Sequence, residues 1–234
     1  MIPLLAAAAA LTVGAVPPAA REAAPLPSYA AGDAFVYSDG RVEQVRSIDG
    51  DVISWAGLQG DPYQRPRNFV LPVLGWRFNQ GEGRRSVSGH PETLWPLAPG
   101  KAARFSVITE FRRTPQAAWE RNLALWTCKV GARHDVQVPA GRFPVMTIDC
   151  DRFSSWNMRL QERVSSDYAP DVGHYVRRTI TDYLAARATT IALTGALHGP
   201  AATRPRLAAL SAEATNAGKS GPSEARARSA ALGR

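Results

Sequence analysis

Hydrophobic and polar residues alternate most regularly between Trp126 and Val138. The even positions of this stretch are mainly apolar, and the odd positions are mainly polar or charged. A period of two residues is typical of a strand with one buried face. After a tight connection at 139–141, the alternation resumes and continues through Cys150. The pattern therefore predicts a β-hairpin centred on Pro139.

The two cysteines of the chain, Cys128 and Cys150, lie on this hairpin. A hairpin centred on Pro139 places them opposite each other on its apolar side. Opposed Cβ atoms lie ~4.5–5.5 Å apart, slightly more than the ~3.8 Å usual in a disulfide. A non-hydrogen-bonded pair, or a small bulge at Gly131, would close this difference. We predict a disulfide that stabilises the fold by about 3 kcal/mol.

Turn dipeptides predict further hairpins. Asp39-Gly40 and Asp49-Gly50 separate short apolar runs and indicate a three-strand meander over 33–57. The remaining expected elements are a loop from Gly60, strand material at 69–76, a loop at 79–91, a strand at 105–111 and a closing hairpin at 168–197. The expected fold is all-β, a curved antiparallel sheet or open partial barrel of hairpins.

The N-terminal segment differs in composition from the rest. Residues 1–20 carry no charge and include an apolar run at 4–16 that ends in Pro and Ala, as in a cleaved signal peptide. The run is shorter than the ~20 residues of a membrane-spanning helix. We expect a signal peptide at 1–20, a linker at 21–30 and a β domain at 31–197. The mature protein would be periplasmic or secreted, without a transmembrane span. The alternative is an uncleaved N-terminal membrane anchor.

The net charge of +8 is unevenly distributed. Half of it comes from residues 198–234, which hold six Lys or Arg against two Asp or Glu and no aromatic residue. Such a segment cannot bury enough apolar surface to order itself, so we predict a disordered basic tail. The body is nearly balanced and lacks the basic patch with aromatic or helical context that nucleic-acid binding requires. Nucleic acid is not an expected partner.

Candidate catalytic chemistry is sparse. Neither a G-x-S-x-G nucleophile motif nor a nucleotide-binding glycine loop is present, and we predict no catalytic residue, metal or cofactor. A hydrolase that uses His90 or His174 is a weak alternative. A zinc site built from Cys128, His134, Cys150 and His174 is disfavoured because no C-x-x-C or H-x-x-x-H spacing occurs. His134 falls on the apolar face of its strand, where a half-buried histidine is expected.

Aromatic and arginine side chains offer a binding surface instead. Tryptophan more often fills a β core, but rings and guanidinium groups together suit an apolar or anionic ligand. The candidate ligand-binding residues are Trp126, Trp156, Arg159, Tyr175 and Arg177.

Three short motifs resemble a known group of proteins. LWPLAPGK at 94–101, VPAGRF at 138–143 and YAPDVGHYVRR at 168–178 occur in the order seen in uncharacterised exported β proteins of proteobacteria. The resemblance implies an open, strongly curved sheet or partial barrel in the cell envelope, and it carries no catalytic residues. Neither the cysteine pair nor the basic tail belongs to it.

The sequence thus predicts a non-catalytic cell-envelope protein. Its expected partner is an apolar or envelope-derived ligand on a concave sheet, or an envelope protein. The alternative is a structural or scaffolding protein of the envelope that docks through its basic tail.

Overall fold

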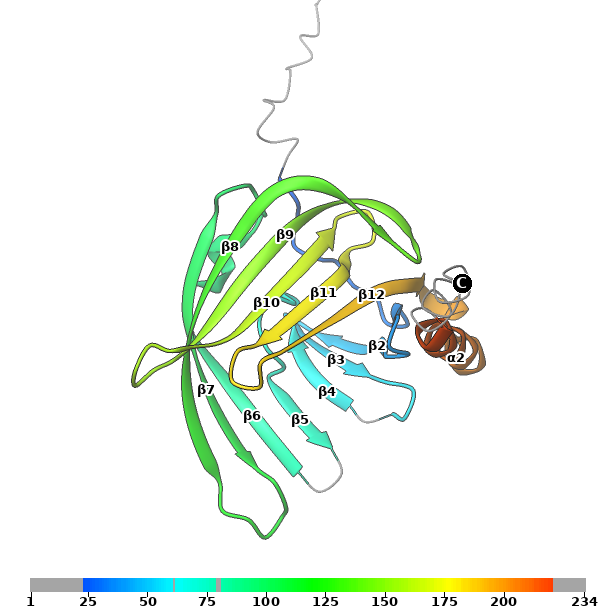
Figure 1. Ribbon diagram of the computed structural model, residues 1–234. Helices are drawn as coiled ribbons and strands as arrows, with labels where there is room; N and C mark the ends of the chain where they lie inside the picture. The colour runs from blue at the N-terminus through cyan, green and yellow to red at the C-terminus, as the bar shows by residue number, and fades with distance from the viewer. Residues whose placement is uncertain (1–22, 61, 79–80, 221–234) are drawn as a thin grey trace, which may run out of the picture.

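The computed structural model describes residues 23–60, 62–78 and 81–220, which form a β-barrel with a C-terminal helix outside it (Figure 1). The predicted signal peptide at 1–20 lies outside the described residues. The strands are β1 (Ala34–Tyr37), β2 (Val42–Asp49), β3 (Val52–Ala56), β4 (Pro62–Pro66), β5 (Gly75–Phe78), β6 (Gly81–Gly89), β7 (Ala102–Arg112), β8 (Glu120–Val138), β9 (Gly141–Ser154), β10 (Leu160–Ala169), β11 (His174–Asp182) and β12 (Arg187–Leu197). The helices are the 3₁₀ turns η1 (Pro91–Leu94) and η2 (Gly199–Ala201) and the α-helix α2 (Arg204–Ser220).

The sheet is closed. Each strand pairs antiparallel with the next, and β12 returns to pair with β1, where Ala34 faces Leu197. The predicted all-β antiparallel fold is confirmed, but the prediction of an open sheet or partial barrel is wrong. Closure joins the two ends of the β domain, a pairing for which the chain carries no local signal. It also uses β4 and β6, whose polar segments we expected to be loops.

The predicted hairpins form, and the register predicted for the cysteines is confirmed. Near the β8–β9 turn the pairing is shifted by one residue from the predicted register, with Val138 opposite Gly141. Gly40 and Gly50 adopt the positive φ values of 81° and 56° that the turns of the meander require. Cys128 lies directly opposite Cys150, with their Cα atoms 4.0 Å apart, and the two form a disulfide. The disulfide leaves neither sulfur available as a metal ligand.

A β-bulge interrupts the β8–β9 ladder between Val130 and Arg133, next to Gly131, where a bulge was one of the two alternatives expected. The extra residue increases the local twist of the strand. Beyond the bulge His134 is exposed, so the prediction of a half-buried histidine is wrong at this position.

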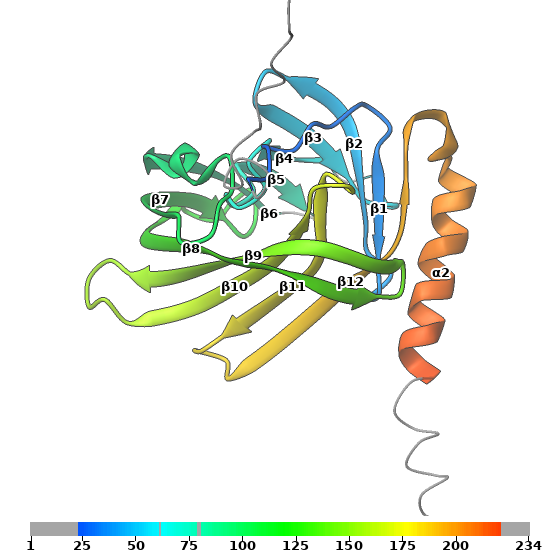
Figure 2. The ribbon, with the colours of Figure 1, turned by 90° about the horizontal axis from the view of Figure 1, so that it is seen from above.

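Helix α2 packs on the outside of the barrel against β1 and β12 (Figure 2). Leu207 and Ala214, seven residues apart on one helix face, are buried with Ala34 and Val36 of β1. Residues 199–220 are therefore ordered, unlike the predicted disordered tail. The outward face of β1 is apolar, and this gives the small side chains of the helix a surface to cover. Residues 221–234 of the predicted tail lie outside the described part of the chain.

The two ends of the barrel differ. Because the strands run up and down in order, the connections after even-numbered strands share one end, here called the closed end, and those after odd-numbered strands share the open end. The closed end is plugged by buried side chains of the β4–β5 and β6–β7 connections, Phe69, Leu71, Leu94 and Leu97. Part of the predicted linker joins this plug, since Ala24 forms a bridge with Leu97 and Tyr29 is buried. No helix among the described residues is both long and apolar enough to cross a membrane.

Candidate ligand-binding cavity

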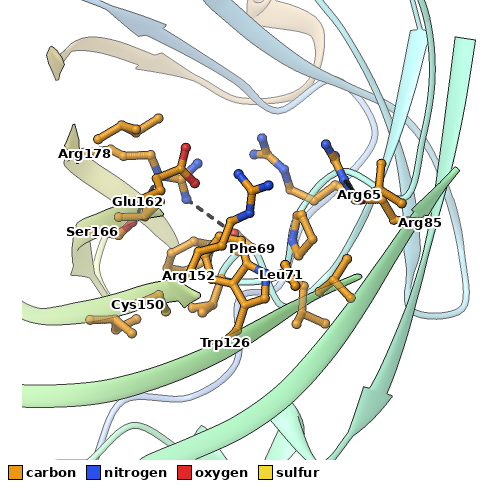
Figure 3. A pocket seen from close by; sticks show the side chains of 18 of the residues that line it. Arg65, Phe69, Leu71, Arg85, Trp126, Cys150, Arg152, Glu162, Ser166 and Arg178 are labelled. Atoms are coloured by element: carbon orange, nitrogen blue, oxygen red, sulfur yellow. Dashed lines mark hydrogen bonds between the residues drawn. The ribbon is translucent and has the colours of Figure 1, made fainter. Parts of the chain in front are cut away.

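A cavity of about 530 Å³ lies inside the barrel between the plug and the open end (Figure 3). This volume is within the ~300–1,000 Å³ typical of small-molecule sites. Alternate residues of β7 to β11 point into it, as the pleat of a barrel wall requires. They are Val107, Thr109 and Phe111 of β7, Asn122, Ala124 and Trp126 of β8, Ile148, Cys150 and Arg152 of β9, Glu162, Val164 and Ser166 of β10, and Arg178 and Ile180 of β11.

The cavity reaches toward the open end of the barrel. Six of its lining residues lie within two positions of the strand ends found there: Trp76, Phe111, Asn122, Arg152, Glu162 and Ile180. Phe69 and Leu71 of the plug line its opposite side. A ligand would therefore enter between the open-end turns and stop at the plug.

One wall of the cavity is apolar. Val107, Trp126, Ile148 and Val164 contribute side chains from four neighbouring strands, and Cys150 adds one sulfur of the disulfide. The indole of Trp126 stacks on Phe105, with ring centroids 6.1 Å apart and an angle of 4° between the planes. The stacking holds the indole flat and gives the wall a fixed shape.

Four arginines and one glutamate also line the cavity, so its charge is predominantly positive. Figure 3 shows Arg65, Arg85, Arg152 and Arg178 directed into the same space, with Trp126 below them in this view. Two of these arginines, Arg85 and Arg178, are held in place by uncharged partners, which leave their positive charge in place.

Arg178 is held by the plug and by β10. Its guanidinium donates hydrogen bonds to Ser166 Oγ at 3.0 Å and to the carbonyl oxygen of Phe69 at 3.3 Å. It also lies over the ring of Tyr175, 3.7 Å from the centroid. These partners carry no charge, so the cation keeps its capacity to pair with an anion.

Arg85 is held in a similar way. It donates to Thr109 Oγ1 at 3.1 Å and to the carbonyl oxygen of Val73 at 3.0 Å, and it lies 4.3 Å over the indole of Trp76. Trp76 in turn lies across Gly83, where a Cβ atom would come within 2.1 Å of the indole. Gly83 is thus required for the placement of the ring beneath Arg85.

Arg152 and Glu162 face each other across the β9–β10 pair. Neither side chain takes part in a hydrogen bond or ion pair within the described structure. Burial raises the pKa of the Glu162 carboxyl, while Arg152 opposes the shift and Asp182 adds to it. The pKa of Arg85 is lowered, by burial first and by Arg152 next, as expected where cations share a confined space. The cavity therefore offers near its mouth a guanidinium that no hydrogen bond or ion pair of the described residues engages, with the Glu162 carboxyl facing it.

A buried polar network anchors the fourth arginine, Arg65. Its Nη1 donates to Glu43 Oε2 at 3.3 Å, and His174 Nε2 lies 3.2 Å from the same oxygen. The hydroxyl of Tyr29 lies 2.6 Å from His174 Nδ1. An ionised Glu43 only accepts hydrogen bonds, so His174 donates through Nε2 and accepts from Tyr29 through Nδ1.

Burial and hydrogen bonding decide the charges of this network. Burial lowers the pKa of His174 to about 4, although Glu43 opposes the shift, and the imidazole is neutral near pH 7. Burial alone would raise the pKa of Glu43, but Arg65 and His174 together outweigh it and the pKa is lowered. The network thus contains one ion pair and a neutral histidine, and it fixes Arg65 at the edge of the cavity. His174 is fully buried and does not line the cavity.

The structure distributes the predicted ligand-binding residues over three places. Trp126 lines the cavity. Tyr175 does not line it, but its ring lies beneath the guanidinium of Arg178, which does. Trp156 and Arg159 lie exposed in the β9–β10 turn. Arg177 faces outward and donates to Asp167 at 2.6 Å. The five residues do not form one groove.

Arg152 and Glu162 are cavity residues that the sequence analysis did not select. Both lie at alternate positions of their strands, which face the barrel interior. On β9 these positions are Ile148, Cys150 and Arg152, and on β10 they are Glu162, Val164 and Ser166. This alternation is the signal that could have identified Arg152 and Glu162. Arg65 and Arg85 lie in segments expected to be loops, for which no strand parity was assigned.

No protein-family model matches the chain, and no curated protein matches it significantly. Among solved structures, similarity is found to the hypothetical lipoprotein YmcC from Escherichia coli, with a TM-score of 0.47 and 5% identity over 70% of this chain and 82% of that one. A protein from Bacteroides fragilis described as exported and YmcC-like in fold gives a TM-score of 0.38 and 11% identity over 75% of this chain and 99% of that one. A lipoprotein from Parabacteroides distasonis gives 0.37 and 11% over the same shares. At these scores the similarity carries no argument about function, which must come from the cavity.

Proposed function

We propose that this protein is a non-catalytic binding protein of the cell envelope whose barrel takes up an amphipathic anion. The ligand would have an apolar chain and a carboxylate or phosphate group. The observation that supports this most directly is the pairing of an apolar wall with arginines that are fixed by neutral partners. An apolar ligand alone would leave these cations desolvated and unpaired, which is unfavourable.

The proposed location rests on two features. The apolar run at 4–16 is typical of a signal peptide, and disulfides such as Cys128–Cys150 persist in oxidising compartments. A periplasmic or secreted protein would carry both. The likeness of three motifs to exported β proteins of proteobacteria agrees with this location and remains a prediction.

Titration with cis-parinaric acid, a fluorescent fatty acid, tests the proposal on the purified protein. The acid should bind at least roughly tenfold more tightly than its methyl ester, because a hydrogen bond to a charged group is worth ~1.5–3 kcal/mol. Arg152→Ala should weaken binding of the acid by a similar factor and leave the affinity for the ester unchanged. Arg163→Ala is the matched control, because Arg163 pairs with Asp151 on the exposed side of the same strand pair.

A second variant tests the site without altering a charge. Ala124 is buried and lines the cavity, so Ala124→Phe would occupy part of its volume. We expect this variant to keep the circular dichroism spectrum of the parent and to lose binding of both acid and ester. Equal affinity for acid and ester in the parent, or unchanged binding in Ala124→Phe, would contradict the proposal.

A further inference from the structure

Large apolar side chains that face solvent gather at the turns of the open end. They lie on four of its connections and are here called the apolar rim: Phe78 at the end of β5, Trp119 between β7 and β8, Trp156 and Met158 between β9 and β10, and Tyr183 and Leu184 between β11 and β12. The up-and-down connectivity forces these turns to the same end of the barrel. In Figure 1 the β7–β8 and β9–β10 turns project from the lower and left sides of the barrel.

The β9–β10 turn presents the most exposed of these side chains. Trp156 is 86% exposed, and the turn is closed by a hydrogen bond from the backbone N–H of Met158 to the carbonyl oxygen of Ser154 at 3.0 Å. Met158 adopts a φ of 55°, a backbone conformation that residues other than Gly and Asn rarely take. The backbone thus holds an indole and a thioether in water, where each loses the stabilisation that burial would provide. Tryptophan in such a position is typical of the boundary between water and lipid.

Exposed arginines without an acidic partner accompany the rim. Arg121 and Arg159 lie beside its turns, and neither forms an ion pair in the part of the chain that the structure describes. Arg187, at the start of β12, lies opposite Asp182 and adds to the effect of backbone hydrogen bonds in lowering the pKa of that carboxyl. Two carboxylates near these turns are already engaged. Glu82 pairs with Arg77 and Arg112, and Asp182 accepts hydrogen bonds from the backbone of the β11–β12 turn. The surface therefore combines apolar tips with free positive charge.

We propose that the open end docks on an anionic lipid bilayer, with the apolar rim at headgroup level and the arginines against lipid phosphates. Tryptophan and aliphatic side chains interspersed with arginine are the composition of interfacial membrane-binding segments. A second copy of the chain fits this surface less well, because a two-fold contact would place the arginines of both copies against one another. The inference stands on exposure and position, and it does not depend on what the cavity binds.

Docking in this orientation would place the mouth of the cavity against the bilayer. Phe111, Asn122, Arg152, Glu162 and Ile180 lie on the strand ends from which the rim projects. A lipid-derived ligand could then pass between bilayer and barrel without crossing water.

Flotation of the purified full chain with phosphatidylethanolamine vesicles, with and without phosphatidylglycerol, tests the docking. We expect binding to the vesicles that contain phosphatidylglycerol and a loss of that binding as salt is raised. The double variant Trp156→Ser with Leu184→Ser should bind at least roughly tenfold more weakly. The matched control is Ile48→Ser, since Ile48 is an exposed apolar residue, 38% accessible, in the β2–β3 hairpin at the closed end.

Fluorescence quenching by lipids brominated on their acyl chains locates the contact. The parent should be quenched on binding, whereas Trp156→Phe should keep its vesicle affinity and lose most of the quenching. Equal vesicle binding by the parent and the double variant would overturn the inference, as would a concentration-dependent dimer that the double variant abolishes. The double variant should still bind cis-parinaric acid in the absence of vesicles. A loss of vesicle docking through the rim can therefore be told apart from a loss of ligand binding in the cavity.

Discussion

The hydroxyl of Tyr29 lies 2.6 Å from Nδ1 of His174, a residue 145 positions further along the chain. This contact joins the segment before the first strand to the start of β11, near the closed end of the barrel. Both side chains are buried, and the far side of the imidazole is occupied by Glu43. The histidine is therefore held neutral, and this has a consequence for stability.

Stability should fall as the solution is acidified below the ordinary pKa of histidine. The unfolded chain takes up a proton at His174 below about pH 6.5, whereas the folded protein does so only near its lowered pKa of about 4. Between these values the unfolded state binds more protons, so the free energy of unfolding should decrease by up to roughly 3 kcal/mol. Urea unfolding from pH 7 to pH 4 measures this effect.

His174→Gln should reduce the slope of that pH dependence, because glutamine does not titrate. A slope in His174→Gln that matches the slope of the parent would show that His174 does not carry the effect.

Removal of the disulfide should destabilise the barrel without changing its fold. Cys128→Ala with Cys150→Ala opens a loop of 22 residues, for which the chain-entropy model gives a loss of about 3 kcal/mol. Both sulfurs are buried, so the loss of packing adds to this figure. Urea unfolding under oxidising conditions should place the variant at a lower midpoint than the parent, and an unchanged midpoint would contradict the prediction.

Binding of an anion in the cavity should strengthen as pH falls through the raised pKa of Glu162. Protonation removes the negative charge that faces Arg152, so the site becomes more positive. Decyl sulfate, which stays ionised throughout, is a suitable ligand for isothermal titration below its micellar concentration. Glu162→Gln should bind more tightly than the parent at neutral pH and show less pH dependence. Weaker binding by this variant would contradict the assigned charge effect.

Helix α2 should contribute to the stability of the barrel through Leu207. This side chain is buried against β1, so Leu207→Ala should cost roughly 2 kcal/mol or more in the free energy of unfolding. Glu213→Ala changes an exposed position of the same helix and should stay within about 0.5 kcal/mol of the parent. Thermal unfolding of the three proteins compares them, and equal effects of the two substitutions would show that the helix is not docked through Leu207.

Local patterns allowed much of the fold to be predicted. The alternation on either side of Pro139 led to the opposed cysteines and to the β8–β9 register around them. The Asp-Gly turns located the first three strands. These features depend on residues close together in sequence, where period and turn chemistry are sufficient.

The binding site was less accessible to the same reasoning. Trp126 was selected by residue type, and the structure places it in the cavity because it lies on the inward face of β8. Arg65 and Arg85 belong to polar strands that resemble loops. Trp156 and Arg159 were grouped with Trp126 by residue type alone, and the structure places them at the rim. On such strands, inward-facing and outward-facing positions can be distinguished only from the structure of the closed barrel.

The sequence by itself determined the antiparallel hairpins, the disulfide register and the mixed apolar and basic character of the chain. The tertiary structure alone decided that β12 pairs with β1, that α2 covers the outward face of β1, and that four arginines share one cavity. The reason is physical: hairpins form from neighbouring residues with a short period, whereas closure and the cavity depend on contacts between segments more than a hundred residues apart. Such contacts leave no periodic trace in the chain.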